Sequence, residues 1–331
     1  MAIDLDKIKK EKTTKELLNF GILNIDKPVR KTSFEVSDFV RKKIAEAEGI
    51  ETKKKSRKTS HFGTLDPQVT GVLPIALGRG VKLTGFFIGE DKTYVGIARF
   101  HQPVEIKKLQ EKIDEKFLGR IVQTPPIKSS VKRQAREREV YEYKILETSE
   151  KESEKNKDFL FYVKCQGGTY ARKLVSDLGE ELGIGGHMLE LRRLKAGPFS
   201  ENKREGKNGD KINGCVNLYD FEKAIDEYKK SGDEKAEEKL RELIIPAEVV
   251  SELYPFLELK DKQDRIKQFL TGKPIYLRDI ENPEKLENLE EGKIVSVFLK
   301  NRFIGMYRLV NSQENKNKKE DVFLKPEFVY N

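Results

Sequence analysis

The chain has no tryptophan and few residues with sulfur or imidazole side chains. Its 331 residues include two cysteines, three histidines and three methionines. Cys165 and Cys215 are too few for the disulfide framework of a secreted domain, and they suit a reducing compartment. His61, His101 and His187 lie far apart in the sequence and have no metal-ligand spacing with the cysteines. No metal site is therefore predicted.

Long apolar runs are also absent. No stretch approaches the roughly 18 apolar residues that a membrane helix needs. The N-terminal segment MAIDLDKIKKEKTTKELL carries acidic residues and lacks an apolar centre, unlike a secretory signal peptide. These absences predict a soluble, cytoplasmic protein with no membrane partner.

Charge of both signs is abundant, with a basic excess. Charged residues make up 37% of the chain, and the formal net charge is +9. Residues 27–58 contain eleven lysines and arginines against five acids, and end in the basic run KKKSRK at 53–58. The excess favours a polyanionic partner such as nucleic acid, although a charge run is also typical of a solvated loop. At this length the chain can bury a sizeable core, and two domains are predicted.

Residues 58–77, KTSHFGTLDPQVTGVLPIAL, combine an acidic loop with a short apolar run. Pro67 disfavours the helical conformation at Asp66, so this carboxylate is expected on an extended or turning backbone. Gly63 and Gly71 allow sharp bends and the close approach of another molecule. The apolar run is typical of a buried strand. Asp66 is therefore a candidate reactive group, and an ordinary Asp-Pro turn is the alternative.

Hydrophobic periodicity predicts strands and helices in mixed order along the chain. Strands are predicted at residues 20–25, 72–77, 94–100, 140–146 and 159–165. Helices are predicted after a capping box at Thr32–Glu35, over 106–117, over 171–182, and as a charged pair within 217–245. Residues 1–18 are expected to be a charged lead-in, helical from Thr14, and 200–214 an exposed insertion.

The segment from 246 to 331 has a pattern of its own. A helix is predicted over 261–270, ending at Gly272, and two strands over 293–299 and 302–310. This pattern predicts a small, mostly β domain.

Five separate motifs occur in order along the chain. They are Asn24-Ile25-Asp26-Lys27-Pro28, the pattern from His61 to Pro74 around Asp66, Lys92-Thr93-Tyr94, Gly168-Thr169-Tyr170-x-Arg172, and His187-x-x-x-Leu191-Arg192-Arg193. Over roughly residues 20–245 they resemble the TruB/dyskerin family of pseudouridine synthases. Phe62 departs from this resemblance, because the family is expected to have a small residue there. We therefore expect the packing around His61 to differ from that of the family.

The resemblance implies an α+β fold with a central, mostly antiparallel mixed sheet flanked by helices. The basic stretch PPIKSSVKRQAREREVY at 125–141 resembles the archaeal and eukaryotic branch, the catalytic subunits of H/ACA guide-RNA particles. The C-terminal segment resembles a PUA-type RNA-binding domain, with a different small β-barrel as the alternative. We expect a charged N-terminal extension at 1–19, a catalytic domain at 20–245 and a PUA-like domain at 246–331.

The implied reaction isomerises uridine in RNA to pseudouridine. The N-glycosidic bond breaks, the uracil turns, and its C5 joins the ribose, with no cofactor and no metal. The base is flipped out of the RNA first. The reaction requires an ionised carboxylate, and the resemblance assigns this role to Asp66, as nucleophile or as base. Arg172 is its basic partner, and Tyr94 stacks on the uracil and can serve as a base.

The resemblance also gives four residues a role in RNA binding. His61 fills the space that the flipped nucleotide leaves, and Lys27 supports the loop or a phosphate. Tyr170 and Leu191 line the pocket. Without the resemblance these residues would be an ordinary loop histidine, a surface lysine and two core residues.

The implied substrates are tRNA, notably uridine in the T-loop, and rRNA sites chosen by an H/ACA guide RNA. The implied partners are the guide RNA and the small H/ACA accessory proteins. One alternative is a catalytically silent RNA-binding scaffold in ribosome assembly, which needs only a basic surface and not Asp66, Tyr94 and Arg172 together. Another is a glycosidase of small nucleosides, which would have a second catalytic carboxylate and no basic rim.

Overall fold

A computed structural model describes residues 3–50, 57–125, 133–148, 156–207, 209–261, 263–286, 289–310 and 322–331. Its largest feature is a ten-stranded sheet with the order β12-β1-β3-β8-β4-β7-β6-β5, where β2 also pairs with β3 and β9 with β8. These strands are β1 (Gly21–Lys27), β2 (Thr59–His61), β3 (Thr70–Leu77), β4 (Lys92–Phe100), β5 (Gly119–Gln123), β6 (Arg136–Thr148), β7 (Asp158–Cys165), β8 (Gly186–Ala196), β9 (Phe199–Ser200) and β12 (Ile244–Pro246). The β3–β8 pair is parallel and the other described pairs of this sheet are antiparallel. The predicted mostly antiparallel mixed sheet is confirmed.

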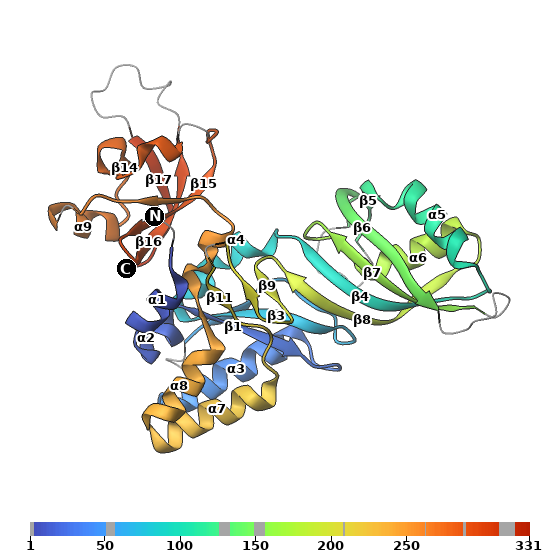
Figure 1. Cartoon of the computed structure of the whole chain (residues 1–331), viewed down its shortest axis with the longest axis horizontal. Helices are drawn as coiled ribbons and strands as arrows, with labels where there is room; N and C mark the ends of the chain where they lie inside the picture. Colours follow the sequence, from blue (N-terminus) through green and yellow to red (C-terminus); the bar gives the residue numbers. More distant parts are fainter. Residues whose placement is uncertain are drawn as a thin grey trace.

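Helices cover the sheet in two groups (Figure 1). Beside β5–β7 lie α5 (Ile106–Lys116) and α6 (Ala171–Glu181). Around β1 and β12 lie α1 (Leu5–Glu11), α2 (Thr14–Asn19), α3 (Ser33–Ala47), α7 (Leu218–Ser231) and α8 (Glu234–Leu243). Within the described ranges, none of the helices is both long and apolar enough to cross a membrane.

The predicted capping box fixes the start of α3. The Thr32 hydroxyl accepts a hydrogen bond from the Glu35 backbone N–H at 3.1 Å, and the Glu35 carboxylate accepts from the Thr32 backbone N–H at 2.7 Å. Val36, Val40 and Ile44 then recur at helical spacing and are buried. This region agrees with the prediction because all of its signals are local.

Two segments differ from their predictions. The N-terminal lead-in contains a further helix, α1, whose Leu5 and Ile8 are buried. The segment 200–214 is not simply exposed: β10 (Arg204–Glu205) pairs with β11 (Lys211–Ile212), and the Ile212 side chain is buried. In both segments a few apolar residues among many charged ones pack against distant parts of the chain.

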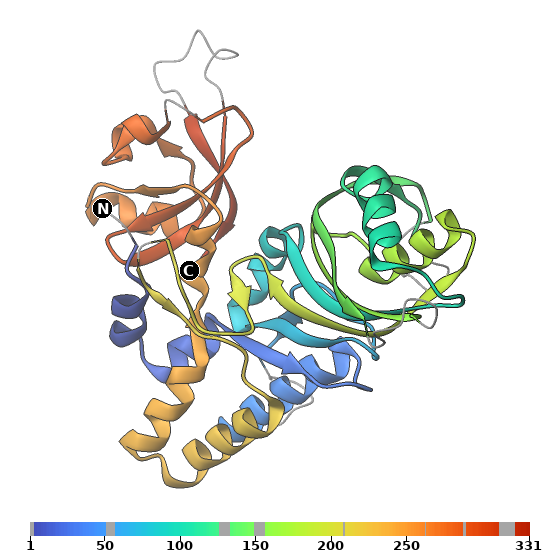
Figure 2. The same ribbon diagram turned by 45° about the vertical axis from the view of Figure 1, so that its right-hand side comes forward.

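The C-terminal part forms a second sheet of five strands in the order β13-β15-β16-β17-β14. Its elements are β13 (Phe256–Glu258), α9 (Gln263–Leu270), β14 (Ile275–Tyr276), β15 (Ile294–Leu299), β16 (Arg302–Leu309) and β17 (Val322–Val329). The prediction of one helix and a strand pair here is confirmed. Figure 2 shows this domain standing apart from the α5–α6 end of the main sheet.

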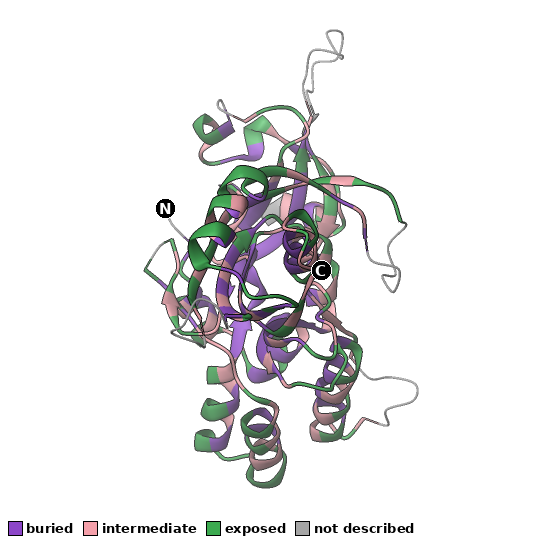
Figure 3. Cartoon of the chain, turned by 90° about the vertical axis from the view of Figure 1, so that its right-hand side faces the viewer, coloured by how far each residue is buried: buried purple, intermediate pink, exposed green. Residues whose placement is uncertain are grey.

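Buried residues concentrate along the strands of both sheets (Figure 3). One cluster is shared between the two parts of the chain. Phe20, directly before β1, stacks on Phe303 of β16 at 5.4 Å between ring centroids and on Tyr330 at 4.1 Å. The C-terminal domain is therefore packed against the start of β1 through an aromatic core.

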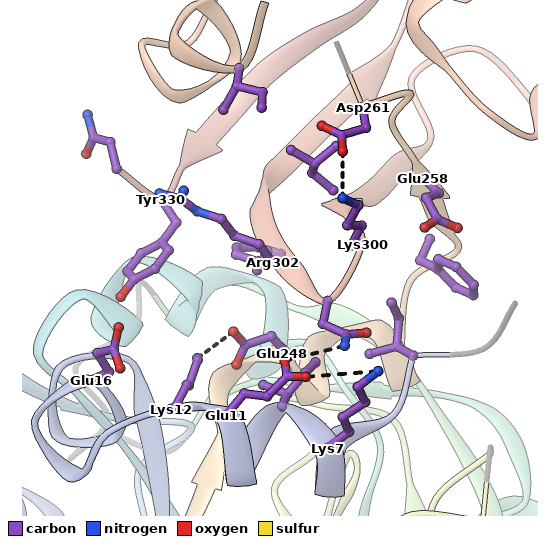
Figure 4. Close-up of a pocket in the computed structure, with 18 residues that line it drawn as sticks. Lys7, Glu11, Lys12, Glu16, Glu248, Glu258, Asp261, Lys300, Arg302 and Tyr330 are labelled. Atoms are coloured by element: carbon purple, nitrogen blue, oxygen red, sulfur yellow. Dashed lines mark hydrogen bonds and ion pairs between the residues drawn. The ribbon is translucent and has the colours of Figure 1, made fainter. Parts of the chain in front are cut away.

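A cavity of about 1100 Å³ lies between α1 and the turn from β15 to β16 (Figure 4). Charged residues form pairs on each wall, including Lys12 with Glu248 at 2.5 Å and Lys300 with Asp261 at 2.5 Å, and the Asn301 side chain donates across to Glu11 at 3.4 Å. Asp66 is not among the residues that line it. The cavity belongs to the domain junction rather than to the predicted reactive loop.

Candidate active site

Asp66 lies on a tight loop between β2 and β3. Gly63 and Gly71 have φ values of +90° and +97°, in the left-handed region that favours glycine. A turn closes between them, where the Asp66 carbonyl accepts from the Val69 N–H at 3.0 Å. The Ser33 hydroxyl bonds both the N–H (2.8 Å) and the carbonyl (3.1 Å) of Leu65, so α3 anchors the loop. The Asp66 side chain is 47% exposed, which leaves the carboxylate accessible.

Lys27 is fully buried beneath the same loop. Its ammonium group donates to the carbonyls of Pro28 at 2.9 Å, Lys31 at 2.6 Å and Pro67 at 3.3 Å. Burial lowers the pKa of Lys27, and the nearby charge of Asp66 acts in the opposite direction. Of the two predicted roles, these contacts favour support of the loop over binding of a phosphate.

Arg172 lies in the first turn of α6 and contacts Asp66. Its Nη1 is 2.9 Å from Oδ2 of the carboxylate. A cation at a helix N-terminus is disfavoured by the helix dipole, so the carboxylate compensates for an unfavourable position. Both side chains are almost half exposed, and solvent screening keeps the contribution of the pair to stability small. The pair therefore mainly orients the two groups.

Tyr94 lies in β4, directly opposite Arg193 of β8. Only 8% of the residue is exposed. Burial raises the pKa of the Tyr94 phenol, and the charge and hydrogen bond of Arg193 act against that rise. The phenol is neutral near pH 7, with a cation beside it that would favour its ionised form.

Arg193 is the residue at this site whose role the motifs did not reveal. It is 1% exposed, yet its guanidinium donates to the Val72 carbonyl at 2.7 Å and to the Gly63 carbonyl at 3.1 Å. These carbonyls lie on either side of Asp66 in the sequence, so one buried side chain joins the Asp66 loop to Tyr94. Its position opposite Tyr94 in the sheet register is the signal that could have identified it.

The other predicted residues surround this centre at different depths. Nε2 of His61 is 3.1 Å from the Thr64 hydroxyl, and burial lowers the pKa of His61. Tyr170 directly precedes α6, and its backbone N–H and carbonyl both bond the Gln123 side chain. Leu191 lies opposite Gly96 of β4 and is buried.

Phe62, the departure from the family pattern, points into the shared aromatic core. It stacks on Phe87 at 4.5 Å and lies 5.9 Å from Phe199. The large side chain is thus accommodated in this core, while Asp66 and His61 stay partly exposed.

Most of the two predicted basic segments, 53–58 and 128–138, falls outside the described residues or at their edges. Arg57 is described, and its guanidinium pairs with Glu48 and donates to the Asn19 side-chain carbonyl at 2.7 Å. This arginine therefore has a structural role, and the interpretation of the run as an RNA contact stays a prediction.

Lys92, at the start of β4, gives a testable pH dependence. Burial and the charge of Arg193 lower its pKa from 10.5 to about 8, so the unfolded chain binds more protons between these values. Stability should therefore rise with pH across this window. Relative to K92M, wild type should gain about 2 kcal/mol in free energy of unfolding between pH 7.5 and 9.5. Urea unfolding of both proteins at the two pH values measures this, and a difference that is flat or falls would contradict it.

Comparisons with known proteins agree with this architecture. The family description "TruB family pseudouridylate synthase (N terminal domain)" matches residues 51–171, and "tRNA pseudouridylate synthase B C-terminal domain" matches residues 172–251. The probable tRNA pseudouridine synthase B of Nanoarchaeum equitans is 35% identical over 94% of this chain and 81% of its own length. That of Korarchaeum cryptofilum is 41% identical over 74% of this chain and 66% of its own length.

Two solved structures have the same fold over nearly the whole chain. A Cbf5-Nop10-Gar1 complex matches with a TM-score of 0.76 and 30% identity, covering 97% of this chain and 88% of the other. An H/ACA RNP bound to a substrate RNA containing 2'-deoxyuridine matches with a TM-score of 0.75 and 28% identity, covering 98% and 89%. The fold is that of a pseudouridine synthase, an isomerase that acts on RNA. The chain belongs to the TruB family of these enzymes.

Proposed function

We propose that the enzyme converts uridine to pseudouridine in the T-loop of tRNA and, with an H/ACA guide RNA, in rRNA. The contact between Asp66 and Arg172 at 2.9 Å carries this proposal, because it orients an accessible carboxylate with a cation at its side, on the loop that Arg193 links to the buried Tyr94. The names of the archaeal relatives support tRNA as a substrate. The likeness to an H/ACA particle with substrate RNA supports the guided activity.

The chemistry assigns different tasks to the groups around the flipped uridine. The Asp66 carboxylate either attacks the ribose or takes a proton from it, and the N-glycosidic bond breaks. The uracil turns, its C5 bonds to the ribose, and the C5 proton leaves. Tyr94 stacks on the base. In its phenolate form, which the charge of Arg193 favours and burial disfavours, it accepts this proton and becomes the neutral phenol.

The remaining predicted residues bind and shape the RNA. His61 occupies the place of the flipped nucleotide in the RNA stack, and Tyr170 and Leu191 line the pocket for the base. Lys27 holds the loop that carries Asp66 through its three carbonyl contacts.

The proposed partners are a guide RNA and small accessory proteins of the kind present in the matched complexes, Nop10 and Gar1. The C-terminal sheet, within the proposed domain 246–331, would bind RNA as a PUA-like domain, and residues 20–245 would form the catalytic domain. The two free cysteines support a cytoplasmic location.

Release of tritium from C5-labelled uridine tests the proposal. Wild-type protein is incubated with a tRNA transcript alone, and then with a labelled rRNA fragment, its guide RNA and the accessory proteins. Release from either RNA supports an isomerase on that substrate. If neither RNA releases tritium while both bind, the scaffold function replaces the proposal.

Removal of the Arg172 cation should slow the reaction more than it weakens RNA binding. We expect R172Q to lower the single-turnover rate on tRNA by about 100-fold, because the carboxylate loses its orienting partner. R172K keeps the charge and should recover part of this loss. K173Q, which removes the charge next to it on α6, serves as the control. A rate for R172Q equal to that of K173Q would contradict the role of the ion pair.

A further inference from the structure

A pocket of about 470 Å³ opens between α3, β2 and the segment formed by η1 (Gly78–Leu83) and α4 (Thr84–Ile88). Its polar lining consists of three cations and three hydroxyl groups, from Arg41, Lys58, Lys82, Thr59, Ser60 and Thr84. Among the described residues, no acid lines it. Val81 is the apolar residue of the lining. In a chain with 56 acidic residues, a pocket whose described polar side chains are all cations and hydroxyls has the chemistry of an anion site.

The walls of the pocket are tied together. The Thr59 hydroxyl bonds Ser37 of α3, accepting from its hydroxyl at 3.0 Å and donating to its carbonyl at 3.1 Å. The Gly78 N–H donates to the Lys58 carbonyl at 2.8 Å, which fastens η1 to β2. Because these bonds use backbone and hydroxyl groups, the ammonium groups of Lys58 and Lys82 are not needed to hold the walls.

Arg41 is held in a defined orientation at one side. Its Nε and Nη2 donate to a carboxylate oxygen of Asp38 at 2.9 and 2.6 Å, and Lys42 pairs with the other oxygen at 2.8 Å. Asp38 is the acid nearest to Arg41 in the sequence. Because it pairs with two cations, Arg41 and Lys42, these three side chains together keep one positive charge. Three basic side chains therefore give the pocket a net positive potential.

The place of the pocket in the fold indicates which anion it takes. β2 leads directly from Ser60 to His61 and on to the Asp66 loop. On the other side, Arg79 of η1 donates to the Val329 carbonyl at 3.1 Å, and the Tyr254 hydroxyl donates to the Phe86 carbonyl of α4 at 2.9 Å. The pocket thus lies between the candidate active site and the C-terminal domain.

We propose that this pocket binds a backbone phosphate of the RNA, on the strand that runs from the flipped uridine toward the C-terminal domain. The inference rests on the proposed function, and it adds a second RNA contact that none of the five motifs contains. Lys58, Lys82 and Arg41 neutralise the phosphate, and the Ser60 hydroxyl donates to it.

The test compares two double variants that remove the same charge. K58Q/K82Q empties the pocket of two ammonium groups, and K229Q/K230Q removes two exposed lysines at the far end of α7. Binding of the tRNA transcript is measured by fluorescence anisotropy from 50 to 200 mM KCl, with single-turnover tritium release at saturating RNA.

We expect K58Q/K82Q to bind about tenfold more weakly at 100 mM KCl, and to flatten the slope of log affinity against log salt by about 0.7 to 0.9 for the lost phosphate contact. K229Q/K230Q should stay within about twofold of wild type in affinity and should keep the wild-type rate at saturating RNA. Equal affinity and slope in the two double variants would overturn the proposal.

Inorganic phosphate distinguishes a free anion from an RNA phosphate. The melting temperatures of wild type and K58Q/K82Q are measured with and without 10 mM phosphate, a concentration that would occupy an anion site with a Kd of roughly 1 to 10 mM. If phosphate raises the melting temperature of wild type only, and K58Q/K82Q binds RNA as tightly as wild type, the pocket takes a free anion and the RNA proposal is wrong. Absence of tritium release from wild type would count against the proposed function alone, because the affinity measurement does not depend on catalysis.

Discussion

The substitution D66N should abolish product formation while leaving the fold and RNA affinity intact. An amide is neutral, so it can neither attack the ribose nor take a proton from it, and we expect the rate to fall by at least about 1000-fold. Folding should survive because the loop is held by the carbonyl of residue 66, by Ser33 and by Lys27, not by the carboxylate. Single-turnover tritium release measures the rate, and anisotropy the RNA affinity.

The variant D66E separates charge from position. It keeps an ionised carboxylate but moves it by one methylene, away from the present 2.9 Å contact with Arg172. A rate between those of wild type and D66N is expected. If D66N retained more than about a tenth of the wild-type rate, with its RNA affinity unchanged, another group would have to carry the chemistry.

The parts of the fold that were predicted correctly depend on short-range signals. The capping box at Thr32 and Glu35 and the apolar spacing of α3 involve neighbours within one or two turns. The helices α7 and α8 follow the same logic, since Gly232 adopts the left-handed conformation that ends α7 and Asp233 caps α8. Tertiary packing is not needed to recognise these features.

The features that were missed depend on contacts between distant segments. Leu5 and Ile8 alone do not predict a helix among so many charges, and α1 is stabilised by packing against the core that includes Phe303 and Met306. Ile212 is buried for the same reason. The candidate site behaves likewise: motif resemblance supplied Asp66, Tyr94 and Arg172, but only the register of β4 against β8 places Arg193 beside Tyr94.

Loss of Arg193 should have the largest effect on stability that we expect from any single change at the site. R193M replaces the guanidinium with an apolar chain and leaves the carbonyls of Val72 and Gly63 and the Tyr94 phenol without their donor. Unsatisfied buried acceptors should lower the free energy of unfolding by about 2–4 kcal/mol. Because the same bonds hold the Asp66 loop, the single-turnover rate should fall by about 100-fold or more in the fraction that stays folded.

An exposed arginine and a conservative variant make this test specific. R99M removes an arginine from the same strand as Tyr94, but Arg99 is 48% exposed and pairs with Asp158 in solvent, so a change below about 1 kcal/mol is expected. R193K keeps a buried cation with fewer donors, and should recover rate more than stability if the charge beside Tyr94 matters to the chemistry. Urea unfolding followed by circular dichroism gives the stabilities. If R193M and R99M were equally stable and equally fast, Arg193 would contribute only packing. Its hydrogen bonds would then not be what connects the Asp66 loop to Tyr94.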